Sequence, residues 1–206
     1  MSAQPRLRDL LLEGQRVALR PLDARDAQAA FGMLAHKREI LDWLEWPGPE
    51  APEDLAPMFT SWRQGLEEGS DYHLAIVDRS DGGFAGGLDL RFRGHAGCGN
   101  LGYWVDTARW GRGLAGEAVQ LAAWLCFERL EGTLLSARVF VGNEASRHIL
   151  DKAGFREDHR SKTLFDGVPR EQWHLSLTRS DYLAQSRPRP RAARVELESS
   201  LERQPD

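Results

Sequence analysis

The sequence predicts a mixed α/β fold in a single layered domain, and two observations lead to this. Alternating apolar patterns typical of strands are interrupted by longer patterns typical of helices, in an irregular order. Strong turn signals at residues 80–83 and 166–167 join neighbouring strand patterns, which indicates antiparallel hairpins. The 206 residues suffice for one domain with a substantial core, and we assign residues 1–183 to it.

The first half of the chain opens with a strand that Pro21 stops and a helix that Asp23 and Asp26 open. Gly69 predicts the end of a second, longer helix. The expected elements are, in order, a strand over 16–22, a helix to about 35, a loop or short helix over 41–52, a helix over 52–68, and hairpin strands over 72–78 and 84–92.

The second half contains a glycine-rich segment, and Asn143 and Gly154 there are typical of the two ends of a helix. The expected elements are a loop over 93–99, a strand over 100–105, a helix over 117–130, a strand over 134–141, a helix over 144–153, and strands over 156–164 and 172–178. Residues 184–206 turn into an Arg–Pro run followed by acidic residues, and we expect a flexible or weakly helical tail.

Composition narrows the class of protein. A net charge of −4 and a pI of about 5.9 do not suggest nucleic-acid binding. No apolar run is long enough for a membrane span, so no membrane partner is expected. The two cysteines, Cys98 and Cys126, form neither a disulfide framework nor a metal pattern, and the histidines lack metal-ligand spacing. We therefore expect a cytoplasmic protein without a metal site.

A glycine loop carries the clearest chemical signal. Gly111, Gly113 and Gly116 spell G-x-G-x-x-G ahead of a helix, where backbone N–H groups and the helix N-terminus can hold phosphate. A tight turn without a ligand would give the same letters. A dinucleotide-binding oxidoreductase fits poorly, because residues 106–110 separate the loop from Val105, where that fingerprint follows the strand directly.

Downstream residues indicate a different cofactor. Asn143-x-x-Ser146-x-x-x-Leu150-x-x-x-Gly154-Phe155 resembles the hallmark of the GNAT family of N-acetyltransferases. The loop from Trp110 to Ala115, with Trp in first place, resembles the RimJ/RimL branch, as do residues 19–22, 46–47, 84–87 and 102–105. The resemblance covers about residues 16–178. It implies a mixed, mostly antiparallel sheet with splayed central strands and helices on both faces, and acetyl-CoA as cofactor.

The resemblance also implies which residues bind the cofactor. Amides of the loop would hold the pyrophosphate, and a backbone N–H of Trp104 or Val105 would polarise the acetyl carbonyl. Asn143 would bond the pantetheine. The full set expected at the cofactor is Trp104, Val105, Arg109, Gly111, Arg112, Gly113, Leu114, Ala115, Gly116, Asn143 and Ser146.

The expected catalytic residues are Ser146, as proton donor to the thiolate, and Asp89, as base directly or through water. Relatives often carry a Glu at the start of the strand where this chain has Gly99-Asn100, and a Tyr where it has Leu150. The alternatives are that Ser146 is an ordinary serine of a first helical turn, and that Asp89 lies on the solvent face of an edge strand. The absent Glu favours an α-amine acceptor, which deprotonates more readily than lysine.

The acceptor site is the least defined part. We expect Trp43, Trp46 and Tyr103 to contact the acceptor, while Trp62 fits a core position as well. The function implied is acetyl transfer to a primary amine, either a protein N-terminus or a small molecule. A non-catalytic acyl-CoA-binding module is the alternative. The resemblance also suggests a homodimer.

Overall fold

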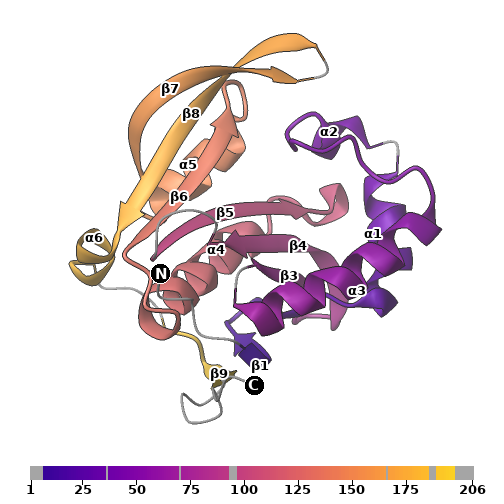
Figure 1. Ribbon diagram of the computed structural model, residues 1–206, viewed down its shortest axis with the longest axis horizontal. Helices are drawn as coiled ribbons and strands as arrows, with labels where there is room; N and C mark the ends of the chain where they lie inside the picture. Colours follow the sequence, from indigo (N-terminus) through magenta and orange to yellow (C-terminus); the bar gives the residue numbers. More distant parts are fainter. Residues whose placement is uncertain are drawn as a thin grey trace, which may run out of the picture.

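One nine-stranded sheet forms the centre of the molecule (Figure 1). The computed structural model describes residues 7–35, 37–69, 71–92, 97–165, 167–185 and 189–197. The strands are β1 Leu7–Glu13, β2 Val17–Pro21, β3 Asp71–Asp78, β4 Gly83–Arg91, β5 Cys98–Val105, β6 Leu134–Phe140, β7 Arg156–Phe165, β8 Val168–Thr178 and β9 Ala192–Leu197. Their spatial order is β7-β8-β6-β5-β4-β3-β2-β1-β9. β5 and β6 run parallel, and the other neighbouring pairs are antiparallel.

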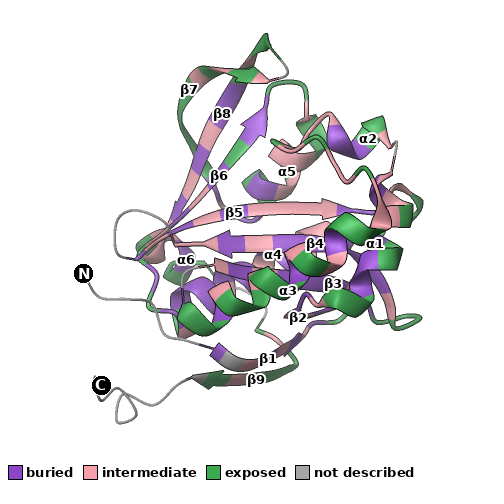
Figure 2. Cartoon of the chain, turned by 45° about the vertical axis from the view of Figure 1, so that its right-hand side comes forward, coloured by how far each residue is buried: buried purple, intermediate pink, exposed green. Residues whose placement is uncertain are grey.

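Helices cover both faces of this sheet. The helices are α1 Ala27–Leu34, α2 Arg38–Leu41, α3 Pro52–Glu68, α4 Leu114–Trp124, α5 Glu144–Lys152 and α6 Arg179–Leu183, with a π-helical turn Leu125–Arg129 and 3-10 turns Ala24–Asp26 and Thr107–Arg109. α1 and α3 pack on one face, while α4 and α5 pack on the other. Figure 2 shows exposed residues along the outer side of α3 and on β7, and buried ones in the central strands. No helix in these ranges is long and apolar enough to cross a bilayer.

The side chains of β5 are shared between two cores. Leu101, Tyr103 and Val105 pack on the α4–α5 side. Trp104 packs on the opposite side, with Phe59 of α3 and Phe84 of β4. This alternation is the ordinary period of a strand. The two faces of β5 therefore meet two different chemical environments.

The parallel pair β5–β6 opens along its length. The strands pair only at Cys98–Leu134, Gly99–Leu135 and Asn100–Ser136. Beyond Asn100 the two strands separate, which confirms the expected splayed central strands. The Asp106 N–H donates to the Ala85 carbonyl, 2.9 Å away. Because successive N–H groups of a strand point to opposite edges, the N–H groups of Tyr103 and Val105 face the gap, and that of Trp104 faces β4.

Most elements match the sequence predictions, with differences at several ends. β8 begins at Val168 rather than at residue 172, and the short helix α6 was not predicted. α3 covers Pro52–Glu68 as predicted, and Gly69 ends it with φ 74°. α4 begins at Leu114 rather than at residue 117, because Gly113 adopts a left-handed conformation and starts the helix at once. The loop expected over 93–99 is wrong at its end, because Cys98 and Gly99 belong to β5, and residues 93–96 lie outside the described ranges.

The prediction of a flexible or weakly helical tail is wrong for β9, which pairs antiparallel with β1. The strand β1 was not predicted from the sequence, although its alternate leucines Leu10 and Leu12 are buried as in a strand with one face in the core. A buried strand needs a partner along each edge for its backbone polar groups, and β9 supplies it on the outer side. The division into a domain over residues 1–183 and an appended tail remains a prediction.

Candidate active site

A cleft of about 1020 Å³ runs between the splayed strands and reaches both faces of the sheet. On the α4–α5 face the glycine loop and the first turn of α5 line it. On the α1–α3 face Trp43, Trp46 and Asp89 line it. The cleft therefore brings together the expected acceptor residues and the expected cofactor residues other than Arg112, which lines a separate cavity.

The glycine loop has the geometry of an anion cradle. Gly111 and Gly113 have φ values of 74° and 75°, a conformation that side-chain-bearing residues rarely adopt. The first N–H groups of α4, after Gly113, have no partner within the helix and point outward from its N-terminus. A Cβ added at Gly116 would meet nothing within 4 Å, so this side of the loop is open. The Trp110 indole N–H fixes the loop by donating to the Val105 carbonyl, 2.8 Å away.

The two loop arginines are held by carboxylates behind the loop. Arg109 contacts Asp78 at 2.7 Å and Asp81 at 2.9 Å, and Arg112 contacts Asp78 at 2.8 Å. Burial opposes ionisation of Asp78, but hydrogen bonds from Ser80 and Arg109 and the charge of Arg112 outweigh it and lower the pKa of this carboxyl. These arginines thus fix the loop to the β3–β4 turn, and part of their charge is neutralised there.

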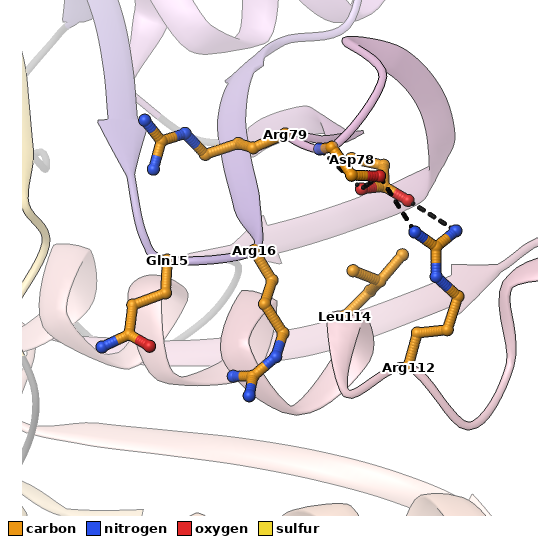
Figure 3. Close-up of a pocket in the computed structure, with 7 residues that line it drawn as sticks. Gln15, Arg16, Asp78, Arg79, Arg112 and Leu114 are labelled. Carbon is orange, nitrogen blue, oxygen red and sulfur yellow. Dashed lines mark hydrogen bonds and ion pairs between the residues drawn. The ribbon is translucent and has the colours of Figure 1, made fainter.

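A smaller cavity of about 490 Å³ lies beside this turn (Figure 3). The Arg112 guanidinium turns toward Asp78, while the Arg16 side chain extends away from it. The cavity shares Leu114 with the main cleft. Both positive and negative side chains line this cavity, and two of them, Arg112 and Asp78, form an ion pair with each other.

Glu117 is a positioning residue of the loop that sequence reasoning missed. Its carboxylate accepts hydrogen bonds from the backbone N–H groups of Gln15, Arg16 and Val17, at 2.6, 2.6 and 3.0 Å. A Cβ at Gly14 would lie 2.7 Å from this carboxylate, so a side chain there would push Glu117 out of its present position. The bonds tie the N-terminus of α4 to the β1–β2 turn. Glu117 is an acidic residue in the first turn of a helix, a position that often stabilises the helix N-terminus, and this could have marked it in the sequence.

The first turn of α5 carries the expected Asn143 and Ser146. The Asn143 side-chain oxygen accepts from the Ser146 N–H at 3.1 Å and caps the helix, as predicted. The Ser146 hydroxyl lies 2.9 Å from the Tyr103 hydroxyl. Leu150, at the position where relatives often carry Tyr, is fully buried. The structure therefore groups Tyr103 with Ser146, on the opposite face of the sheet from Trp43 and Trp46.

Asp89 lies on the α1–α3 face, beside the gap. A Cβ at Gly102 would lie 2.8 Å from Asp89 Oδ1, so the carboxylate reaches across β5 because Gly102 has no side chain. Asp89 Oδ2 lies 2.7 Å from Arg91 Nε in an ion pair. β4 is flanked by β3 and β5, so the alternative of an edge-strand carboxylate is wrong.

Aromatic side chains form a wall near Asp89. The rings of Trp62 and His73 stack with centroids 4.0 Å apart and planes 11° apart. The ring centroid of Phe59 lies 5.3 Å from that of Trp62. His73 is directly opposite Asp89 on the neighbouring strand. Trp62, which also fitted a core position, is thus both packed and part of the cleft wall.

The loop after α2 crosses the cleft and is fastened to β6 and β8. Arg170 of β8 donates to the Asp42 carbonyl, and its guanidinium lies 5.4 Å from the centroid of the Trp43 ring. Glu45 accepts from Gln172 at 2.6 Å and pairs with Arg138 at 2.8 Å. We call this set of contacts the cross-cleft clamp. It joins residues up to 128 positions apart, which explains why sequence patterns did not reveal it.

Comparisons with known proteins agree with this geometry. Residues 16–156 match the family model described as "Acetyltransferase (GNAT) domain". The probable N-acetyltransferase YjcK of Bacillus subtilis is 27% identical over 178 residues, covering 83% of this chain and 98% of that protein. The structure of Mycobacterium smegmatis RimJ in complex with CoA-disulfide superposes with a TM-score of 0.75 at 27% identity, covering 87% of this chain and 90% of that one.

The splayed sheet and the glycine cradle define an acetyl-CoA-dependent acyltransferase. The chain belongs to the GNAT acetyltransferase family, in the branch that resembles RimJ and RimL. The residues present fit CoA: outward-facing amides at Gly113 and the start of α4 suit its phosphates, and the opened strand edge suits its extended arm.

Proposed function

We propose that this protein transfers an acetyl group from acetyl-CoA to a primary amine, by direct attack within a ternary complex. The observation that carries this proposal is the cleft open to both faces of the sheet. Outward-facing amides and Ser146 lie on one face, and Asp89 lies on the other. Donor and acceptor can therefore enter from opposite sides and meet at the gap between β5 and β6.

On the cofactor side, the bound thioester supplies the activated acetyl carbonyl. The amides from Gly113 to Gly116 would bind the pyrophosphate, and Asn143 would contact the pantetheine. The alternation of β5 favours Val105 over Trp104 as the backbone donor to the carbonyl, because the Val105 N–H faces the gap. Ser146 would donate a hydrogen bond to the leaving sulfur.

On the acceptor side, the amine must lose a proton before it can attack. At pH 7 this costs about 1 kcal/mol for an α-amine and about 4–5 kcal/mol for a lysine amine, from their ordinary pKa values. Asp89 would take the proton directly or through water. A carboxylate is a weak base compared with either amine, and the ion pair with Arg91 holds this one in place. A weak base suits an α-amine better than lysine.

Two of the four acidic residues that line the cleft are already ion-paired, Asp89 with Arg91 and Glu45 with Arg138. Glu39 and Glu144 are the other two, so few carboxylates are left for an acceptor that carries several positive charges. A polyamine needs several available carboxylates. Vibrio cholerae spermidine N-acetyltransferase, solved with CoA and spermine, shares the fold at a TM-score of 0.71 but only 17% identity, covering 82% of this chain and 99% of that one. We therefore propose a peptide or protein N-terminus as acceptor, with a small monoamine as the second choice.

The test is thiol release from acetyl-CoA with a matched panel of amines. We expect kcat/KM to be at least about tenfold higher for a peptide with a free N-terminus than for the same peptide with a blocked N-terminus and one lysine. Preference for spermidine would contradict the proposed acceptor. Binding of acetyl-CoA without turnover on any amine would indicate the non-catalytic acyl-CoA-binding module instead.

A further inference from the structure

The contact between Tyr103 and Ser146 joins two elements that line the cofactor side of the cleft. Tyr103 lies on β5 and Ser146 lies on the first turn of α5, 43 positions later. Their hydroxyl oxygens are 2.9 Å apart, which is hydrogen-bond distance, and either oxygen can donate. Both residues line the main cleft.

The Ser146 hydroxyl has one proton and several possible acceptors. A serine in a helix commonly donates back to a backbone carbonyl three or four residues earlier, here in the turn around Gly142 and Asn143. A hydroxyl bound in that way cannot donate to a ligand. Among the described residues, the Ser146 hydroxyl is within hydrogen-bond distance of the Tyr103 hydroxyl and makes no bond to those carbonyls. If Tyr103 donates to the Ser146 oxygen, the serine proton can therefore point into the cleft that Ser146 lines.

Burial determines what Tyr103 can do. It raises the pKa of Tyr103 to about 12, although the hydrogen bond with Ser146 acts in the opposite direction. The phenol therefore stays protonated and neutral throughout the physiological range. A thiol has an ordinary pKa of about 8.5, so a thiolate would not take the proton from this phenol at equilibrium. Tyr103 therefore keeps its proton and can donate a hydrogen bond, either to the Ser146 hydroxyl at 2.9 Å or, less favourably, to the Ser146 carbonyl at 3.5 Å, but it does not act as an acid that gives up its proton.

We propose that Tyr103 is a positioning residue that donates to Ser146 and directs the Ser146 hydroxyl toward the leaving sulfur of the thioester. The inference rests on the proposed acetyl transfer and deepens it. As the C–N bond forms, the C–S bond breaks and its electron pair leaves on sulfur. The Ser146 hydroxyl stabilises this thiolate by a hydrogen bond without losing its proton. The proton lost by the amine passes to Asp89 and then to solvent.

This arrangement compensates for the position at which relatives often carry a tyrosine. In this chain that position is Leu150, whose side chain is fully buried and apolar. Tyr103 supplies a phenol from the facing strand instead and reaches the first turn of the same helix. Tyr103 and Ser146 would then act in series, with Ser146 as the donor to the sulfur.

The test compares Tyr103→Phe with the wild type under saturating acetyl-CoA and amine. The variant keeps the ring and loses the hydroxyl. We expect kcat to fall about 10- to 100-fold, because the misdirected Ser146 hydroxyl loses its hydrogen bond to the charged thiolate, while both KM values stay within about twofold. Tyr182→Phe is the matched control, because Tyr182 is buried on α6 against Phe127 and does not line the cleft. We expect its kcat to be unchanged.

A double-mutant cycle separates positioning from structural support. If Tyr103 acts through Ser146, the variant Tyr103→Phe/Ser146→Ala should be no slower than Ser146→Ala alone. The ratio of kcat between wild type and Tyr103→Phe should also stay constant from pH 6 to 10, since the phenol does not ionise there. Multiplicative losses in the double variant would overturn the inference.

Other outcomes distinguish this inference from the proposed function. An active wild type with an unchanged Tyr103→Phe variant would overturn the role of Tyr103 alone. A wild type that binds acetyl-CoA but transfers no acetyl group to any amine would overturn both. If Tyr103→Phe loses structure by circular dichroism, Ser146→Thr provides the second test. It keeps a hydroxyl in contact with Tyr103 and should retain kcat within about fivefold, whereas Ser146→Ala should not. Equal losses in the two serine variants would contradict the proposal.

Discussion

The two sides of the cleft are built on different principles. On the α4–α5 side, the cradle is made from backbone groups, and its shape depends on the left-handed glycines Gly111 and Gly113. On the α1–α3 side, the walls are made from side chains that hold one another, as in the cross-cleft clamp and the stacked Trp62 and His73. Backbone cradles suit a ligand that never changes. Side-chain walls can change one residue at a time, and we propose that this side selects the acceptor.

On the cofactor side, we expect the largest effect from Gly113→Val, which should weaken acetyl-CoA binding. A β-branched side chain at φ 75° forces the loop to change conformation and removes the amides from the phosphates. Loss of two charge-assisted hydrogen bonds would raise the Kd for acetyl-CoA at least about 100-fold. Isothermal titration calorimetry with acetyl-CoA measures this Kd.

Gly167→Val is the matched control for that variant. Gly167 has φ 72°, and a Cβ there would meet nothing within 4 Å. It lies in the β7–β8 turn, so its substitution imposes a similar backbone strain away from the cleft. The control should lose folding stability to a similar degree and keep its affinity for acetyl-CoA. Equal affinity losses in both variants would contradict the assignment of the loop.

On the acceptor side, Asp89→Asn tests the chemistry rather than the binding. Loss of a general base lowers kcat/KM by about 100-fold. Because an α-amine has a pKa of about 7.7–8.0, more of it is neutral as the pH rises, and the defect should shrink between pH 6 and 9. A steady-state pH profile measures this shift.

Asp158→Asn serves as its control. Asp158 lies on β7, accepts from Ser176 at 2.8 Å and does not line the cleft. Its activity should match the wild type at every pH. A defect of Asp89→Asn that stays constant over the whole pH range would argue for a structural role of the carboxylate, held in place by Arg91, rather than for a base.

The difference between the two sides also determined what the sequence could predict. Local signals worked: Pro52 and Gly69 bounded α3, and Asn143 marked the start of α5. The glycine loop belongs to this class, because its conformation follows from a few neighbouring residues. The opening of β5 from β6 came from the family resemblance, since no local pattern encodes where two strands stop pairing.

Contacts between distant segments could not be predicted in the same way. Gly102 looks like any glycine in a strand until Asp89 is seen to lie across it. The contact of Tyr103 with Ser146 depends on which face of β5 the tyrosine occupies, and that is set by packing against α4 and α5. The strand β9 was hidden by the composition of the tail, although its backbone hydrogen bonds with β1 require no particular side chains.

The smallest expected effect comes from Arg170→Met in the cross-cleft clamp, which tests whether the two sides of the cleft act independently. Methionine keeps a long apolar stem but loses the bond to the Asp42 carbonyl and the cation–π contact with Trp43. These contacts together are worth about 1–2 kcal/mol, so loosening the loop should raise the acceptor KM about tenfold. The Kd for acetyl-CoA should stay unchanged, since the loop amides do not depend on the clamp.

Arg160→Met is the control for the clamp variant, because Arg160 makes a comparable contact with the Trp173 ring, 5.8 Å from its centroid, and lies outside the cleft. It should leave both constants unchanged. If Arg170→Met weakened acetyl-CoA binding as much as acceptor binding, the clamp would support the cofactor side too, and the two sides of the cleft would have to be treated as one coupled unit. An effect confined to the acceptor KM would instead identify the α2–α3 loop as the part of the molecule in which acceptor selectivity can change independently of the cofactor.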